Sequence, residues 1–402
     1  MVLRKKSLTC KTYKKKGGFF RMKKIVGILS AAAVLAASVF AVDFSATVQV
    51  KGDALYGKSV DSTNSIAILG VENTNQKDND LLEISFTGDK AGAFVRFWTT
   101  AKEEVLKVRA LKVWFEPITG IKVTVGNNDL ELYKERINWW KVPCGASVAE
   151  FGSWDGRWAS GAAVHENFGT TVEISAIQNL YIGLGASSDV FSKTGDADAA
   201  INQWGVVAKY QIMDNISAGA AWRYTPNFGL LTAGAEFGNW GTPYYGFLQA
   251  KVRFDGSSAA NSGSKDWKLA GITIDNYISY KLDSGIKFEG TFPVTIRGLL
   301  DKDDKTDVSY MTARAKVTVP VDSVNIYAVI GSDEGFNNGP ASSAGNTIWV
   351  FDKFGDNFNF YGNVGAAFSV GTCSLDLGIE VAYDKPSKTF AWAVPFVAKV
   401  AF

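Results

Sequence analysis

The charged and aromatic side chains with the greatest chemical capacity gather in one long polar stretch, residues 128–167. This stretch also holds the single histidine of the chain, His165, beside Glu166. One histidine without a second histidine nearby cannot build a usual zinc site. No Gly-x-Ser-x-Gly elbow offers a nucleophile on a strand-to-helix turn. We therefore expect neither an enzyme nor any catalytic residue, bound metal or cofactor.

A second set of charged residues alternates with apolar residues along extended segments. Leu82, Ile84 and Phe86, for example, alternate with Glu83 and other polar residues. Successive side chains of a strand point to opposite faces, and a charge that faces lipid costs about 2–4 kcal/mol at the membrane midplane. If the apolar face contacts lipid, the charged face must point into a wet lumen. The charged residues expected to face the lumen are Lys122, Arg223, Lys251, Arg253, Lys287, Glu289, Arg297, Arg314, Lys316, Asp376 and Glu380.

These charges have two interpretations of about equal weight. More of the inward candidates are basic than acidic, and rings of one charge select ions in pores, which favours a mild anion preference. The same charges can instead pair across the wall and only keep the lumen wet.

The elements that must position these residues are strands. Eighteen alternating segments, bounded by turn residues, predict an all-β fold: a transmembrane antiparallel up-and-down β-barrel of about 18 strands. Sixteen strands are the alternative, because 119–127 and 322–331 alternate less clearly. Barrels of either size enclose water. The expected strands are 43–57, 80–88, 90–100, 106–116, 119–127, 168–177, 180–188, 203–212, 215–224, 228–237, 243–254, 267–281, 285–297, 307–319, 322–331, 359–370, 372–383 and 389–402.

The connections between these segments sort by length. Tight turns, such as Gly88-Asp89-Lys90 and Gly371-Thr372-Cys373, alternate with long polar stretches. Outer-membrane barrels have short periplasmic turns and longer extracellular loops, so the alternation predicts which side each connection faces. The long stretches are 58–79, 128–167, 189–202, 255–266, 298–306 and 332–358, of which 128–167 is the longest and the third outer loop.

The last strand presents one apolar face that ends in an aromatic residue. Phe402, Val400, Ala398 and Phe396 share one parity of this strand. The pattern resembles the C-terminal signal by which bacterial outer-membrane barrels are recognised for assembly. The resemblance implies the barrel assembly machinery and outer-membrane lipid as partners.

The first residues indicate export. Residues 22–41 have a basic start, an apolar core and small residues before Val42, which is the pattern of a secretory signal peptide cleaved after Ala41. We expect translation to begin at Met22, with residues 1–21 as an erroneous upstream extension, and 42–402 as the barrel. Residues 1–41 hold ten of the 42 Lys and Arg and none of the 40 Asp and Glu, so the remaining chain has a net charge of −8. That balance gives no support for nucleic-acid binding.

Taken together, the signal peptide, the alternating strands, the terminal Phe402 and the long third loop resemble a bacterial outer-membrane porin. The short leader and the Lys- and Asn-rich style also resemble spirochaetal outer-membrane proteins. The resemblance implies a water-filled channel for passive diffusion of small hydrophilic solutes, with homotrimers as one assembly. The alternative is a surface-exposed adhesin or structural barrel without channel activity.

In porins the corresponding third loop folds into the lumen and narrows it. The resemblance implies that charged and aromatic residues of this loop form the pore constriction here, whereas an external lid is the alternative. The residues concerned are Glu131, Lys134, Glu135, Arg136, Trp139, Trp140, Lys141, Asp155 and Arg157.

Overall fold

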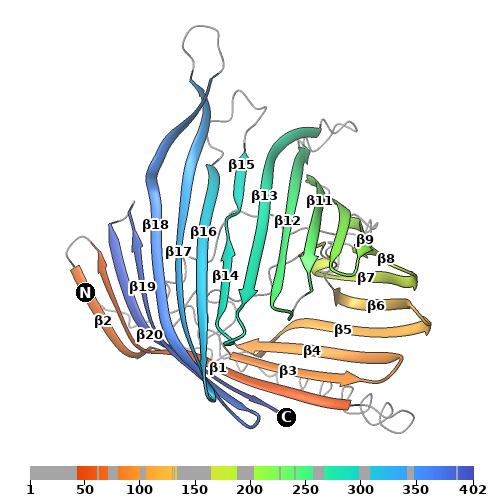
Figure 1. The fold of residues 1–402 in the computed structure, drawn as a ribbon, viewed down its shortest axis with the longest axis horizontal. Helices are drawn as coiled ribbons and strands as arrows, with labels where there is room; N and C mark the ends of the chain where they lie inside the picture. The colour runs from red at the N-terminus through yellow and green to blue at the C-terminus, as the bar shows by residue number, and fades with distance from the viewer. Residues whose placement is uncertain are drawn as a thin grey trace, which may run out of the picture.

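The chain folds into one sheet of antiparallel strands, which Figure 1 shows from β1 in red to β20 in blue. The computed structural model describes residues 43–60, 63–70, 80–99, 106–128, 130, 132–133, 164–187, 203–225, 228–239, 241–256, 267–297, 308–341, 348–385 and 388–402. Within these ranges no helix is both long and apolar enough to cross a membrane. The strands are β1 (Asp43–Val60), β2 (Thr63–Gly70), β3 (Asp80–Thr87), β4 (Ala91–Thr99), β5 (Leu106–Ile118), β6 (Ile121–Asn128), β7 (Val164–Ile177), β8 (Leu180–Ser187), β9 (Gln203–Met213), β10 (Ile216–Tyr224), β11 (Phe228–Gly238), β12 (Tyr244–Gly256), β13 (Trp267–Lys281), β14 (Lys287–Thr291), β15 (Val294–Arg297), β16 (Val308–Val321), β17 (Val324–Ala341), β18 (Ile348–Val370), β19 (Cys373–Asp384) and β20 (Thr389–Ala401).

The sheet closes on itself because the last strand pairs with the first. β20 runs antiparallel to β1 from the Thr47–Ala401 pair to the Ser59–Phe390 pair. Beyond it, the Ala46 N–H donates to the Phe402 carbonyl at 3.1 Å, and the Phe402 N–H donates to the Ala46 carbonyl at 2.8 Å. Closure leaves no open edge between the two ends of the sheet. The fold is therefore a closed barrel, as the sequence predicted.

The twenty strands of the described part occupy eighteen positions around the barrel wall. β14 and β15 both lie between β13 and β16, so they form one interrupted strand. β2 and β3 likewise pair with the two ends of β1 on the same side. The wall thus has 18 strand positions, which confirms the prediction of 18 over 16. The two segments that alternated least clearly are β6 and β17.

Two predicted loops contain strand residues along much of their length, and the predicted loop 128–167 is shorter than expected. Residues 58–79 include the end of β1 and all of β2, and residues 332–358 extend β17 to Ala341 and begin β18 at Ile348. β7 begins at Val164, so it includes the end of the predicted loop 128–167. In the extension of β17, Asp333, Glu334, Asn337 and Asn338 break the alternation of polar and apolar residues. Alternation was the signal used, and a strand without an apolar face lacks it although its backbone ladder continues.

The two faces of the wall differ in burial and in chemistry. On β13, Thr273, Asp275 and Tyr277 are buried, whereas Ile274 and Ile278 are 43% and 50% exposed. The same alternation continues around the barrel, with large apolar side chains exposed on the outer face. This apolar exterior and polar interior is the arrangement of a barrel that faces lipid.

A side chain of β13 replaces the backbone hydrogen bonds that are missing where the strand formed by β14 and β15 is interrupted. No backbone pair joins β13 to the residues between β14 and β15, where Phe292 and Pro293 lie. The Asn276 side chain takes their place: its Nδ2 donates to the Phe292 carbonyl at 2.7 Å and its Oδ1 accepts from the Phe292 N–H at 2.8 Å. A polar side chain on the outer parity of β13 thus satisfies backbone groups that hydrocarbon cannot.

Candidate functional site

The charged residues predicted to face inward separate into two groups. Lys251, Glu289, Arg314, Asp376 and Glu380 are buried beneath neighbouring side chains and not solvated. Lys122, by contrast, keeps 43% of its side chain exposed. Arg297 ends β15, and its side chain lies outside the described part of the structure.

Several of these charges form ion pairs along the inner face. Lys251 Nζ lies 2.8 Å from Asp275 Oδ2, and Lys122 Nζ lies 3.4 Å from Glu173 Oε1. Lys287 pairs with Glu289 at 2.5 Å. A fourth pair, Arg96 with Glu83, joins β4 to β3, with Nε donating to Oε1 at 2.6 Å. Pairing lowers the desolvation cost of placing charges in the wall.

The remaining predicted cations lie over aromatic rings. Arg223 and Arg253 share one ring. Their guanidinium groups lie 5.4 and 4.6 Å from the ring centroid of Phe228. Lys316 lies 5.5 Å from the ring centroid of Tyr327. Such contacts attract a cation to the ring face. They hold the cationic ends at defined positions.

Tyrosines bind the inner carboxylates, and sequence reasoning missed this role. Tyr245 donates to Glu236 at 2.6 Å, Tyr277 donates to Glu289 at 2.9 Å, and Tyr327 donates to Asp376 at 2.6 Å. In addition, Arg314 Nε donates to the Tyr361 hydroxyl at 2.6 Å. The available signal was parity, because each tyrosine lies on the same face of its strand as the charges. The partners, however, come from different strands.

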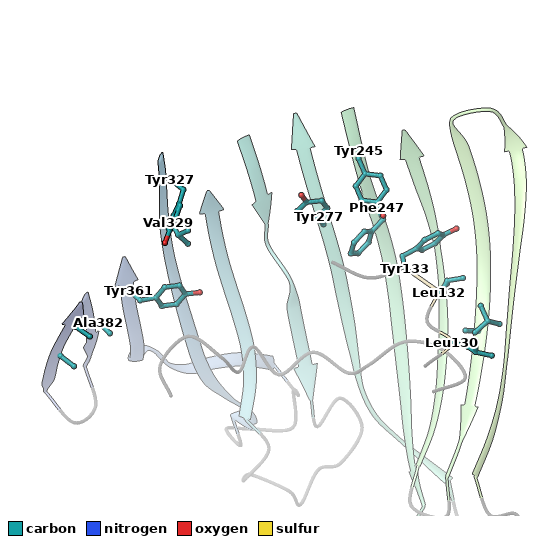
Figure 2. Packing of buried hydrophobic residues seen from close by; sticks show 14 residues of the cluster. Leu130, Leu132, Tyr133, Tyr245, Phe247, Tyr277, Tyr327, Val329, Tyr361 and Ala382 are labelled. Carbon is teal, nitrogen blue, oxygen red and sulfur yellow. The ribbon is translucent and has the colours of Figure 1, made fainter. Parts of the chain in front are cut away.

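The chain that follows β6 lies against the inner face of distant strands. Leu130, Leu132 and Tyr133 are all at most 4% exposed. The Tyr133 hydroxyl shares a hydrogen bond of 3.3 Å with Ser217 on β10, and Gln249 Nε2 on β12 donates to the Tyr133 carbonyl at 3.1 Å. Figure 2 shows Tyr133 beside Phe247, and the two rings stack with their centroids 6.2 Å apart. The first residues of the third loop thus enter the barrel.

Two glycines make room for this segment, which we call the latch (Leu130, Leu132 and Tyr133). A Cβ atom on Gly183 would lie 2.9 Å from Leu130 Cδ1, and one on Gly219 would lie 2.6 Å from Leu132 Cδ1. Both distances are too short for real atoms, so any larger residue displaces the leucine or the wall. Each leucine therefore packs directly on backbone.

The latch completes an aromatic layer on one side of the barrel. Phe247 lies 6.1 Å from Tyr277, which lies 5.9 Å from Tyr245. All are buried. Burial raises the pKa of the Tyr133 phenol above its ordinary value; the Ser217 hydrogen bond lowers it in part and Glu236 adds to the rise. The phenol stays protonated at neutral pH and holds its hydrogen bond.

The opposite side of the barrel lacks such a layer in the described residues. Arg96 and Lys122 retain 38% and 43% side-chain exposure there, whereas Lys251 beside the latch retains 4%. The cationic groups of Arg96 and Lys112 lie 5.5 and 5.8 Å from the ring centroid of Phe94. Lys122 Nζ lies 5.4 Å from the ring centroid of Trp114. Of the four cations in these ion pairs, Arg96 and Lys122 are thus the most exposed, Lys287 follows at 32%, and Lys251 is buried.

The residues predicted for the constriction lie outside the described residues. This applies to Glu131, Lys134, Glu135, Arg136, Trp139, Trp140, Lys141, Asp155 and Arg157. His165 and Glu166 belong to β7, and their side chains are not described. Within the described ranges, no group of three or more His, Cys, Asp or Glu residues is arranged to hold a metal ion.

Comparison with known proteins places the fold. No protein-family model and no curated protein matches the chain. The crystal structure of Pseudomonas aeruginosa OpdL matches with a TM-score of 0.52 at 9% identity, over 90% of this chain and 99% of that one. That of P. aeruginosa OccK3 (OpdO) matches with a TM-score of 0.50 at 8% identity, over 90% and 96%. The chain shares the porin-type barrel fold of these structures. At such identities the likeness is one of fold.

Proposed function

We propose that this chain is an outer-membrane porin, a water-filled channel for passive diffusion of small hydrophilic solutes. The observation that carries the proposal is the division of the wall into an exposed apolar exterior and an ionised interior. An exterior of this kind is stable in hydrocarbon, whereas an interior with charged groups requires water or partners. A closed barrel of 18 strands is wide enough to hold water.

The passage follows the inner faces of β3 to β7. On this side, Arg96 and Lys122 stay partly exposed to water although each pairs with a glutamate. The latch and the aromatic layer lie on the β8 to β13 side. Side chains that water reaches mark where a hydrated solute fits. The lining of this side alternates cations with the rings of Phe94 and Trp114.

The latch supports a narrowing role for the third loop. Leu130, Leu132 and Tyr133 place the start of this loop against the inner face of β8, β10 and β12. We extend this to the constriction residues from Glu131 to Arg157, which belong to the same loop. An aperture lined by charges selects ions by their sign.

Planar-bilayer recording tests the channel. Purified protein, refolded and verified to be inserted, is expected to give discrete conductance steps in KCl. Replacing the solvated cation in Lys122→Gln is expected to shift the reversal potential in a salt gradient toward cation preference. Lys90→Gln, at an exposed turn, is the matched control and is expected to leave the potential unchanged. Silent bilayers with inserted protein would contradict the channel and favour an adhesin or structural barrel.

Export and assembly belong to the same proposal. The leader 22–41 directs secretion, with cleavage after Ala41, and Phe402 at the end of β20 is part of the signal for the assembly machinery. Deleting Phe402 removes both of its backbone bonds to Ala46 at the closing seam. The truncated chain is expected to accumulate as unfolded protein, measured by the loss of the heat-modifiable band, while the few barrels that insert conduct normally. Normal folding yield would argue against the role of Phe402.

A further inference from the structure

An apolar groove crosses four neighbouring strands of the outer wall, β13, β14, β16 and β17. The strand register places Ile278, Gly290, Ala315 and Ile330 in one row across the wall. The row therefore reads large, small, small, large. The adjacent row toward the turn Leu282–Ile286 is Tyr280, Phe288, Val317 and Ala328.

The small residues form a floor between two ridges. Ile278 and Ile330 are 50% and 57% exposed and stand on either side. Gly290 leaves the floor open, because a Cβ atom there would have no neighbour closer than 3.7 Å. The ridges lie three strand spacings apart, about 14 Å between backbones, and their side chains narrow that width. Along the strands, Phe288 and Val317 border this floor on the turn side, whereas Ala328 continues it across β17. The depression thus crosses β14, β16 and β17 and is suited to a long, thin occupant.

We propose that this groove binds one acyl chain of a membrane phospholipid. The inference rests on the proposed function only in placing the outer wall in a bilayer. The groove has a volume of about 490 Å³. This is roughly sixteen times the volume of one water molecule in the liquid, and a methylene group is of similar size, so most of one acyl chain fits. A filled groove regains the dispersion contacts that an empty one lacks.

A second copy of the chain is a poorer occupant. A stable protein interface needs about 800 Å² on each partner, far more than a groove of this size supplies. The wall of another barrel is convex, and the ridges of Ile278, Phe288 and Ile330 keep it from reaching the Gly290 floor. Exposed apolar residues also surround the whole barrel, so nothing singles out this face for protein contact.

The position of the groove selects the periplasmic leaflet. Tyr280 lies two residues before the tight turn that begins at Leu282, and tight turns are on the periplasmic side in the proposed orientation. Tyrosine favours the interface between hydrocarbon and water. The lipid headgroup is therefore expected at the level of Tyr280, with part of its acyl chain on the floor of Gly290, Ala315 and Ala328.

Native mass spectrometry of the full barrel tests this site. The protein is refolded in vesicles of dioleoyl phosphatidylethanolamine and extracted in mild detergent, and the fraction that retains one lipid is measured. Gly290→Leu fills the floor and is expected to lower lipid retention about tenfold. Ala328→Leu fills the groove from β17 and replaces it as the test if Gly290→Leu fails to fold. Ala233→Leu adds the same bulk at an exposed outer position of β11 and is expected to match the unaltered protein.

Two results would overturn the lipid site. One is equal lipid retention by Gly290→Leu, Ala328→Leu and Ala233→Leu. The other is a dimer mass that Gly290→Leu abolishes without changing bound lipid, since a second copy would then cover the groove. Conductance recorded from the same samples separates the two proposals. If Gly290→Leu loses lipid and its conductance is unchanged, both the lipid site and the channel are supported. If Gly290→Leu and the unaltered protein differ in bound lipid but neither conducts, the lipid site is supported and the channel is refuted.

Discussion

Removing the Leu132 side chain is expected to release the latch without unfolding the barrel. Leu132 is fully buried and its Cδ1 lies against Gly219. Truncating a buried leucine to alanine costs about 2–5 kcal/mol, and less where the surroundings can collapse. We expect partial collapse of the surrounding side chains, so we take about 2–3 kcal/mol. That converts to a 30- to 150-fold larger open fraction of the latch.

Hydrogen–deuterium exchange measures that fraction directly. In Leu132→Ala, amides of residues 130–133 are expected to exchange faster by this factor, while amides of β10 and β12 keep their protection. Leu231→Ala makes the same chemical change at an exposed outer position of β11 and serves as the control. It is expected to leave the latch amides unchanged, because Leu231 faces away from the lumen.

Single-channel recording adds a functional readout. A released loop start is expected to give larger and noisier conductance steps in Leu132→Ala than in Leu231→Ala. Unchanged exchange at 130–133 in folded Leu132→Ala would refute the latch. Equal acceleration in the wall strands would also refute it, because the leucine would then stabilise the whole barrel.

Two further substitutions test how the wall is built, each by urea unfolding of the barrel in lipid vesicles. Gly331→Ala places a Cβ atom 2.1 Å from the Tyr361 ring and is expected to lower the free energy of unfolding by about 1–3 kcal/mol through overpacking. In the control Gly362→Ala, the new Cβ atom meets nothing closer than 3.6 Å, so the free energy of unfolding is expected to change by less than about 0.5 kcal/mol. Equal unfolding midpoints for the two variants would contradict the close packing at Gly331. Asn276→Leu makes the outer face more apolar, yet it is expected to destabilise the barrel by about 1–3 kcal/mol. The reason is that the backbone N–H and carbonyl of Phe292 both lose their hydrogen-bond partner. A gain in stability would show that these two groups do not need the Asn276 side chain.

The strands and their faces were readable from the sequence because lipid acts on each residue separately. A membrane-facing position must be apolar whatever its neighbours are, so alternation appears within a single segment such as Leu82–Phe86. The same signal is silent where neither face meets lipid. The extension of β17, which contains Asp333, Glu334, Asn337 and Asn338, was missed for that reason. The break at Pro293 was missed too, because it interrupts hydrogen bonds and not the alternation of side chains.

The contacts inside the barrel were decided only by the tertiary structure. Tyr133 meets Ser217 and Gln249, which follow it by 84 and 116 residues in the chain. Parity assigned inner charges to a face, but closure and register determined that Lys251 is buried in an ion pair while Lys122 remains solvated. The sequence by itself determined an 18-strand barrel with an apolar outside, since that requirement is local. The position of the latch, the solvated side of the lumen and the outer groove depend on which strands lie side by side, and only the closed sheet establishes that.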